Sequence, residues 1–147
     1  MSTSKIRTTL TVAFAHRGNQ SVRIKAIYEP NDPYAVHLVF PSPTGRRELI
    51  WTFARSLLVH GMRQQQTEAP VGEGDITVGP AEARNYVEIV LHPFGRATTR
   101  LYARRDELTS FVAQAYEKVP DEQEDAWIDW REAWSWLHRC VLQGGAA

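Results

Sequence analysis

Hydrophobic and polar residues alternate through the first third of the chain with the two-residue period of β-strands. Two alternating stretches, residues 6–14 and 22–28, are separated by the turn-forming run 17–20, so we expect a hairpin with one buried face. The alternation returns over 34–40 and 49–53, after turns that contain proline and glycine. The pattern therefore predicts four successive strands.

The period changes to that of a helix between residues 53 and 62. Thr52 is a suitable N-cap for this helix, and Gly61 is a natural residue just beyond its C-terminus. A surface loop with three consecutive glutamines is expected at 63–69. The first half of the chain thus reads as four strands followed by one helix.

The second half shows a similar order. Three further alternating stretches predict strands at 73–78, 86–91 and about 96–102. A helix over 106–119 follows, with Asp106 as its cap, and Pro120 ends it because proline cannot continue a helix.

A tryptophan-rich helix is expected near the end of the chain, over 122–142. Asp121 followed three residues later by Glu124 resembles a capping box. Large apolar residues then recur at spacings of three and four and form a narrow seam: Trp127, Trp130, Trp134, Leu137 and Val141. This seam packs either across its own domain or against another subunit or partner, and the sequence leaves both open.

This order of elements predicts an α+β domain, built from two antiparallel β-units that are each closed by a helix. A chain of 147 residues has room for one core, so we expect a single domain over 1–147, β-rich over 6–103 and helical over 106–119 and 122–142. Roughly 70% of the unfolded surface can be buried at this size, so no disulfide is needed. The single cysteine, Cys140, is expected to be a small buried residue in a reducing compartment.

The charges balance, with 17 Lys and Arg against 17 Asp and Glu. A dedicated nucleic-acid-binding protein usually carries a basic surplus that neutralises phosphates, so this balance counts against that class. The N-terminal residues lead into an alternating strand rather than a continuous apolar stretch, and no signal peptide or membrane span is expected. We therefore expect a soluble, cytoplasmic protein.

No motif for catalysis or metal binding stands in the sequence. The five histidines are scattered, no cysteine pair could complete a zinc site, and no Gly-x-Ser-x-Gly nucleophile motif occurs. The glycines of the run 72–75 precede an expected strand rather than a helix, so they indicate a tight turn and not a phosphate loop. We expect a protein that is not an enzyme and has no catalytic, cofactor-binding or metal-binding residues.

Three short blocks combine turn residues, aromatic anchors and a short amphipathic helix. They are Asp32-Pro33-Tyr34-Ala35-Val36 with Phe40, Trp51-Thr52-Phe53-Ala54-Arg55-Ser56-Leu57-Leu58 with Gly61, and Pro70-Val71-Gly72-Glu73-Gly74-Asp75-Ile76 with Pro80. In order and spacing these blocks resemble the SsgA-like proteins, a family of sporulation and cell-division regulators of filamentous actinobacteria. The resemblance runs from about residue 8 to 119 and is dense between 32 and 80.

The resemblance implies a fold similar to the whirly family of single-strand nucleic-acid-binding domains, and assembly as a homotrimer. It further implies a non-enzymatic adaptor in septum-site control, recruited to the division septum, whose partners are other SsgA-like proteins and/or the tubulin-like division GTPase FtsZ. The family pattern tends to carry an acidic residue after the arginine at position 55. This chain has Ser56 there, which weakens the case for a salt bridge along that helix.

Candidate partner-binding residues come from these blocks and from the tail. Tyr34 is either part of the turn chemistry or a tyrosine presented at an interface. Arg55 is either a solvated helix residue or one whose planar donors fix the helix or a partner. The candidates are Tyr34, Arg55, Trp127, Trp130 and Trp134, with the loop around 64–66 as a further place to look.

A second hypothesis is single-stranded nucleic-acid binding through the whirly-like fold. The sequence leaves three roles open for the arginines on which this hypothesis depends. They are solvated charges balanced by nearby acids, they hold a nucleic-acid backbone, or they meet an acidic protein surface. They are Arg46, Arg47, Arg96, Arg100, Arg104 and Arg105, with Tyr102 or Phe94 available for stacking. The zero net charge counts against the nucleic-acid hypothesis.

Overall fold

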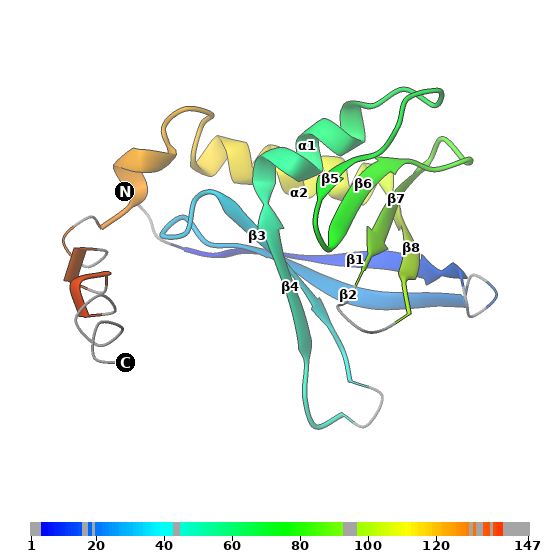
Figure 1. The fold of residues 1–147 in the computed structure, drawn as a ribbon, viewed down its shortest axis with the longest axis horizontal. Coiled ribbons are helices and arrows are strands. Elements are labelled where there is room, and N and C mark those ends of the chain that lie inside the picture. Colours follow the sequence, from blue (N-terminus) through cyan, green and yellow to red (C-terminus); the bar gives the residue numbers. More distant parts are fainter. Residues whose placement is uncertain are drawn as a thin grey trace.

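The computed structural model contains one curled antiparallel sheet of eight strands (Figure 1). The residues that it describes are 4–15, 18, 20–42, 45–92, 97–129, 131, 134–135 and 137–139. The strands are β1 Ile6–Phe14, β2 Gln20–Tyr28, β3 Ala35–Phe40, β4 Leu49–Ala54, β5 Val71–Glu73, β6 Ile76–Pro80, β7 Tyr86–Leu91 and β8 Thr99–Arg104. The helices are α1 Arg55–Arg63, α2 Arg105–Lys118 and the 3₁₀ helix η2 Glu124–Trp127. The prediction of an α+β fold with antiparallel strands is confirmed.

The sheet joins two units of four strands and a helix, in the order β4-β3-β2-β1-β8-β7-β6-β5. Strands β3 and β7 hold equivalent places in the two units and share one succession of half-buried and buried positions. Each helix packs mainly on the other unit, since α1 contacts β6 and β5 while α2 contacts β1. The expectation that each unit is closed by its own helix is therefore wrong, and the two units interlock.

Both helices begin directly after a strand by the same backbone device. The N–H of Arg55 donates to the carbonyl of Tyr34, and the N–H of Arg105 donates to the carbonyl of Asn85, each at 2.7 Å. No side chain caps either helix. The expected caps, Thr52 and Asp106, are therefore wrong, because the chain passes from strand to helix without an intervening turn.

Gly61 lies inside α1 rather than beyond its end. A Cβ atom at this position would lie 2.4 Å from Cγ1 of Val78 and 2.6 Å from the Val78 carbonyl oxygen. The glycine therefore permits close approach of α1 to β6, and the expectation of a helix-ending residue is wrong.

The expected strand at 73–78 is two strands. β5 and β6 form a hairpin that turns at Gly74, whose φ of 69° belongs to the left-handed region. At Gly72 a Cβ atom would lie 2.2 Å from the carbonyl oxygen of Ile76 on the facing strand. The glycines thus build a tight turn, as expected, but inside a hairpin.

The core lies between the two helices and one face of the sheet. Leu10, Leu38, Ile89 and Leu101 come from both units and have no exposed surface. They alternate with outward residues along their strands, as the sequence pattern predicts.

A continuous helix over 122–142 is wrong. Glu122 has a φ of 66°, η2 has four residues, and Ile128 is extended with φ −86° and ψ 130°. Helical geometry returns at 131, 134–135 and 137–139, so the proposed seam crosses the break at Ile128. Cys140, Val141 and Trp130 lie outside the described residues.

Candidate partner-binding surface

Arg55 is a buried hub and not a solvated helix residue, with 1% of its surface exposed. Its Nη1 donates to the Tyr28 hydroxyl at 3.1 Å and to the carbonyls of Ala115 and Val119 at 3.2 and 2.7 Å. Its Nη2 donates to the Glu124 carboxylate at 2.7 Å. One side chain at the start of α1 thus fixes the end of α2 and the segment after it.

Two tyrosine rings enclose this guanidinium. The Arg55 Cζ atom lies 3.8 Å from the centroid of the Tyr116 ring and 5.2 Å from that of the Tyr28 ring, within the range of cation–π contacts. The Tyr28 hydroxyl also donates to the carbonyl of Pro33 at 3.0 Å. Burial raises the pKa of Tyr28 to about 12, even though Arg55 acts in the opposite direction.

Glu124 is the carboxylate that neutralises Arg55, and 8% of its surface is exposed. Burial by itself raises the pKa of Glu124. A backbone hydrogen bond and the Arg55 guanidinium outweigh that effect, and the pKa lies below its usual value. Because removing one partner of a buried pair leaves an uncompensated charge, this contact holds residues 119–127 against the body of the protein.

Tyr34 marks the exposed rim of the same region. Its side chain is 49% exposed, and its hydroxyl donates to Oδ1 of Asp125. This hydrogen bond raises the pKa of Tyr34 to about 12. The turn before β3 is therefore tied to η2 from outside, while Arg55 ties the same parts from inside.

The candidate tryptophans have separate environments. Trp127 is partly buried and packs against the hydrophobic core. Trp134 is 67% exposed, and Leu137 near it is 45% exposed. Among the candidates, the structure thus brings Tyr34, Arg55 and Trp127 to one region. Trp134 lies beyond Ile128, the extended residue that interrupts the predicted helix.

Sequence reasoning missed the residues that complete the Arg55 site. Glu124 reads as a capping residue of a helix, and its partner is 69 positions away. Tyr28 and Tyr116 read as ordinary members of a strand and a helix. The absence of an acid at Ser56 was the available signal, because it leaves Arg55 to find a carboxylate elsewhere.

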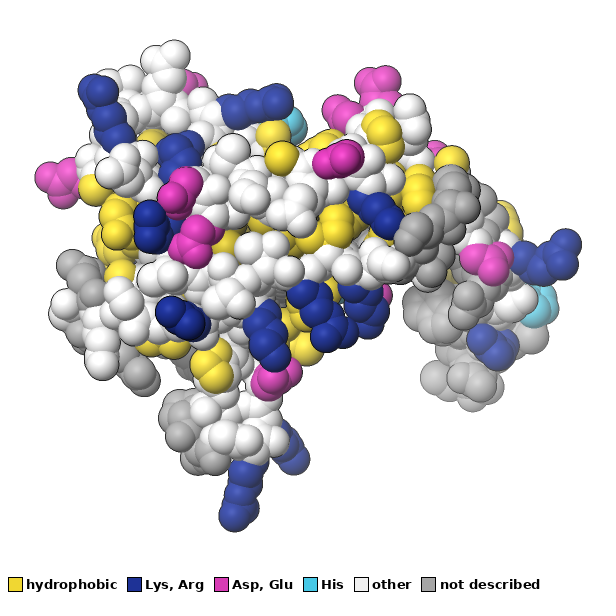
Figure 2. Space-filling model, turned by 180° about the vertical axis from the view of Figure 1, so that it is seen from behind, with side chains coloured by type: hydrophobic (Ala, Val, Ile, Leu, Met, Phe, Trp, Pro, Cys, Tyr) yellow, Lys and Arg dark blue, Asp and Glu magenta, His cyan; other side chains and the backbone are white. Residues whose placement is uncertain are grey.

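The outward arginines are partly neutralised by acids. Arg100 pairs with Glu88 at 3.4 Å, and Arg104 pairs with Asp106 at 3.1 Å. Arg96 lies outside the described residues. Figure 2 shows Lys and Arg side chains in a row below the middle of the view, with acidic side chains and apolar surface nearby.

Among the residues that the structure describes, no group of three or more His, Cys, Asp or Glu side chains could hold a metal ion. Within the same residues, no helix is long and apolar enough to cross a membrane. The geometry described above is one of packing and hydrogen bonding.

Three comparisons relate the chain to known proteins. Residues 22–124 match the family described as "Streptomyces sporulation and cell division protein, SsgA". The chain is 38% identical over 106 residues to the sporulation-specific cell division protein SsgB of Frankia casuarinae, covering 69% of this chain and 68% of that protein. It is 33% identical over 132 residues to SsgB of Salinispora tropica, covering 87% of each.

A solved structure agrees with these sequence matches. The crystal structure of an SsgA-like sporulation-specific cell division protein from Thermobifida fusca aligns with a TM-score of 0.74 and 27% identity, covering 92% of this chain and 97% of that one. None of these relatives is named as a nucleic-acid-binding protein. The chain therefore belongs to the SsgA family of sporulation and cell division proteins.

Proposed function

We propose that this chain is a non-enzymatic adaptor in sporulation-specific cell division, which acts by binding other SsgA-like proteins or FtsZ. The observation that carries the proposal is its identity of 33–38% to relatives named sporulation-specific cell division proteins. We infer that the chain works in the cytoplasm and is recruited to the division septum. The whirly-like label and the homotrimer belong to this proposal, and they rest on family resemblance.

Two exposed aromatic residues are the proposed contact side chains. Tyr34 and Trp134 present large amphipathic surfaces of the kind that dominate protein interfaces. Arg55 and Trp127 have a supporting role in this proposal, because the first is buried and the second packs on the core. The contribution of Trp130 stays a prediction.

Co-sedimentation with FtsZ polymers tests direct binding. The purified chain is mixed with GTP-assembled FtsZ from the same host at physiological salt, and a paralogue is offered in a parallel capture experiment. We expect saturable pelleting or capture that weakens with Trp134→Ala and Tyr34→Ala.

A matched control comes from the β3–β4 hairpin. Ile50 is 55% exposed, and Ile50→Ala should leave binding unchanged. If the chain binds neither FtsZ nor the paralogue at tens of micromolar, the adaptor proposal is overturned. Sedimentation equilibrium checks the trimer, which has three times the chain mass of 16.7 kDa.

A further inference from the structure

A hollow of about 670 Å³ lies between α1 and α2. Its apolar lining includes Val59 and Met62 from α1 and Val112 and Ala113 from α2. A volume of this size falls within the range of small-ligand pockets, and an apolar trough between two helices accepts side chains from a docked segment.

The rim of this hollow is mainly basic. His60, Arg63 and Arg105 line it, against the single acidic residue Asp121. Arg63 is exposed, and the described part of the chain gives its guanidinium no ion-pair partner. The rim therefore favours acidic groups on whatever enters the trough.

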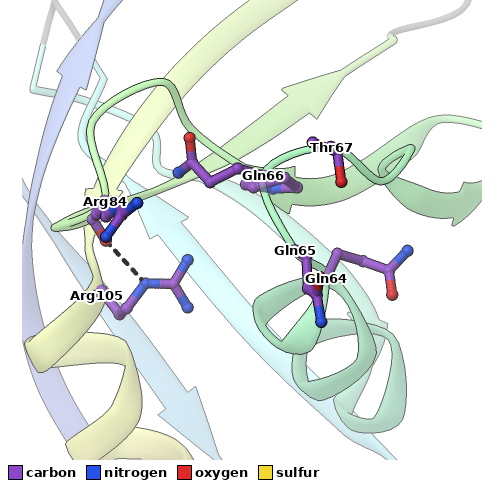
Figure 3. A pocket seen from close by; sticks show the side chains of 7 residues that line it. Gln64, Gln65, Gln66, Thr67, Arg84 and Arg105 are labelled. Atoms are coloured by element: carbon purple, nitrogen blue, oxygen red, sulfur yellow. Dashed lines mark hydrogen bonds between the residues drawn. The ribbon is translucent and has the colours of Figure 1, made fainter.

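A second hollow of about 420 Å³ lies beside the first, and Arg105 lines both. Figure 3 shows Arg84 and Arg105 on one side of it and the loop with Gln64–Gln66 facing them. The loop is held in place, since the Gln66 side chain donates to the Ala81 carbonyl at 2.7 Å. This hollow thus presents two guanidinium groups and amide side chains on a fixed frame.

The Arg105 side chain is positioned by backbone carbonyls. Its Nε donates to the Arg84 carbonyl at 3.0 Å, and its Nη1 donates to the Met62 carbonyl near the end of α1 at 2.7 Å. Arg55 contacts the end of α2 in the same manner, through the Ala115 and Val119 carbonyls. Each helix therefore begins with an arginine that binds the end of the other helix.

The two arginines differ in the carboxylate that completes each site. Arg55 receives Glu124 from its own chain at 2.7 Å. Within the described residues, Arg105 has hydrogen bonds to carbonyls but no ion pair with a carboxylate. Glu124 forms an ion pair with Arg55. A carboxylate from another protein could form the equivalent ion pair with Arg105.

We propose that the two hollows, here named the α1–α2 groove, bind an acidic amphipathic segment of a partner protein. Apolar side chains of the segment enter the trough between the helices, and a carboxylate pairs with Arg105 and Arg84. A nucleic-acid strand fits less well, because Tyr116 is the aromatic residue of the trough and its ring lies against Arg55. The proposal rests on the proposed adaptor function and names the surface and the partner chemistry.

The test uses fluorescence anisotropy with the full chain and two labelled synthetic helices of about four turns. Both carry leucines along one face, and the other face carries glutamates in one peptide and lysines in the other. We expect saturable binding of the glutamate peptide, and at least about tenfold weaker binding of the lysine peptide.

Two variants locate the site. The double change Arg63→Glu with Arg84→Glu should weaken the glutamate peptide about tenfold, whereas Arg23→Glu with Lys25→Glu on the outer face of β2 should change it by less than about twofold. Ala113→Trp fills the trough at unchanged charge and should also weaken binding of the glutamate peptide, by at least about tenfold. Amide shifts in NMR spectra should fall on α1 and α2, and thermal melting confirms that each variant folds.

Equal binding of both peptides, an equal loss with the β2 control, or amide shifts on the outer sheet face would overturn the groove proposal. The same variants are then offered to FtsZ and the paralogue. Binding of the glutamate peptide without capture of either protein refutes the adaptor function and leaves the groove. Capture that is unaffected by the groove variants refutes the groove as the adaptor surface.

Discussion

Arg55 and Arg105 stand at the same place in the two halves of the molecule, yet one is buried and the other borders an open groove. Both follow a strand, and both donate their backbone N–H to the turn before the third strand of their unit. The difference comes from the chain after the opposite helix. Residues 119–127 fold back over Arg55, whereas the loop after α1 leads on to β5 and leaves Arg105 half-buried. A shared backbone frame thus gives a structural site in one unit and a candidate docking site in the other.

Replacing each arginine in turn is the strongest test of this difference between the two sites. Arg55→Met leaves Glu124 buried without its partner, so we expect a loss of about 3–5 kcal/mol in the free energy of unfolding. Arg105→Met removes hydrogen bonds from a half-buried side chain and should cost about 1 kcal/mol. Urea unfolding of both variants measures the difference, and equal losses would contradict the distinction between the two sites.

The position six residues beyond each arginine is Gly61 in α1 and Phe111 in α2. Gly61→Ala places a methyl group against Val78, and we expect a loss of about 1–3 kcal/mol from overpacking. Thermal or urea unfolding measures this loss. Val78→Ala in the same chain should recover part of it, and two changes that simply add would argue against the close approach of α1 to β6.

Acid pH sharpens the comparison through Glu124. The pKa of Glu124 in the folded protein lies below its ordinary value of 4.5, so the ion pair stabilises the fold above that pH. This contribution is lost as the pH falls through the lower, folded pKa. We expect stability to decline below about pH 4.5 in the natural chain and less steeply in Glu124→Gln. Arg105→Met should keep the full acid dependence, because no carboxylate of the described chain pairs with Arg105.

The smallest effect concerns the two turns before the third strands, which carry Tyr34 in one unit and Asn85 in the other. The hydrogen bond to Asp125 raises the pKa of Tyr34 from 10.0 to about 12. In Asp125→Asn, we expect Tyr34 to titrate closer to 10.0. Absorbance titration at alkaline pH, taken as a difference from Tyr34→Phe, follows this single group. An unchanged titration would show that Asp125 does not hold the hydroxyl.

Most of the sheet follows from alternation, because each strand buries one face against the helices. The two longest strands, β1 and β2, carry this pattern over nine residues each, and the sequence predicts both. The β5–β6 hairpin is missed since its strands are short and their glycines serve the close approach of two backbones. Local pattern does not distinguish such a hairpin from one interrupted strand.

The candidate site is less predictable because its partners are distant in sequence. A capping pattern at Asp121 and Glu124 favours a helix start, but the Glu124 side chain points to Arg55, and the chain at Glu122 takes a left-handed conformation. The tertiary ion pair outweighs the local preference. The prediction of one continuous tryptophan seam is wrong for the same reason. Its first residue, Trp127, ends η2 and packs on the core, and the extended Ile128 then interrupts the helix.

The exchange of helices between the two units has a consequence for fragments of the protein. A half-length chain that ends after α1 would keep four strands but lose α2, which covers β1, and its own helix would have no β6 to pack against. Such a fragment can bury its apolar faces only against another chain, for example in a dimer in which the helix of each copy packs on the sheet of the other. Dissection of this protein at the midpoint should therefore yield dimers or insoluble chains rather than two independent modules.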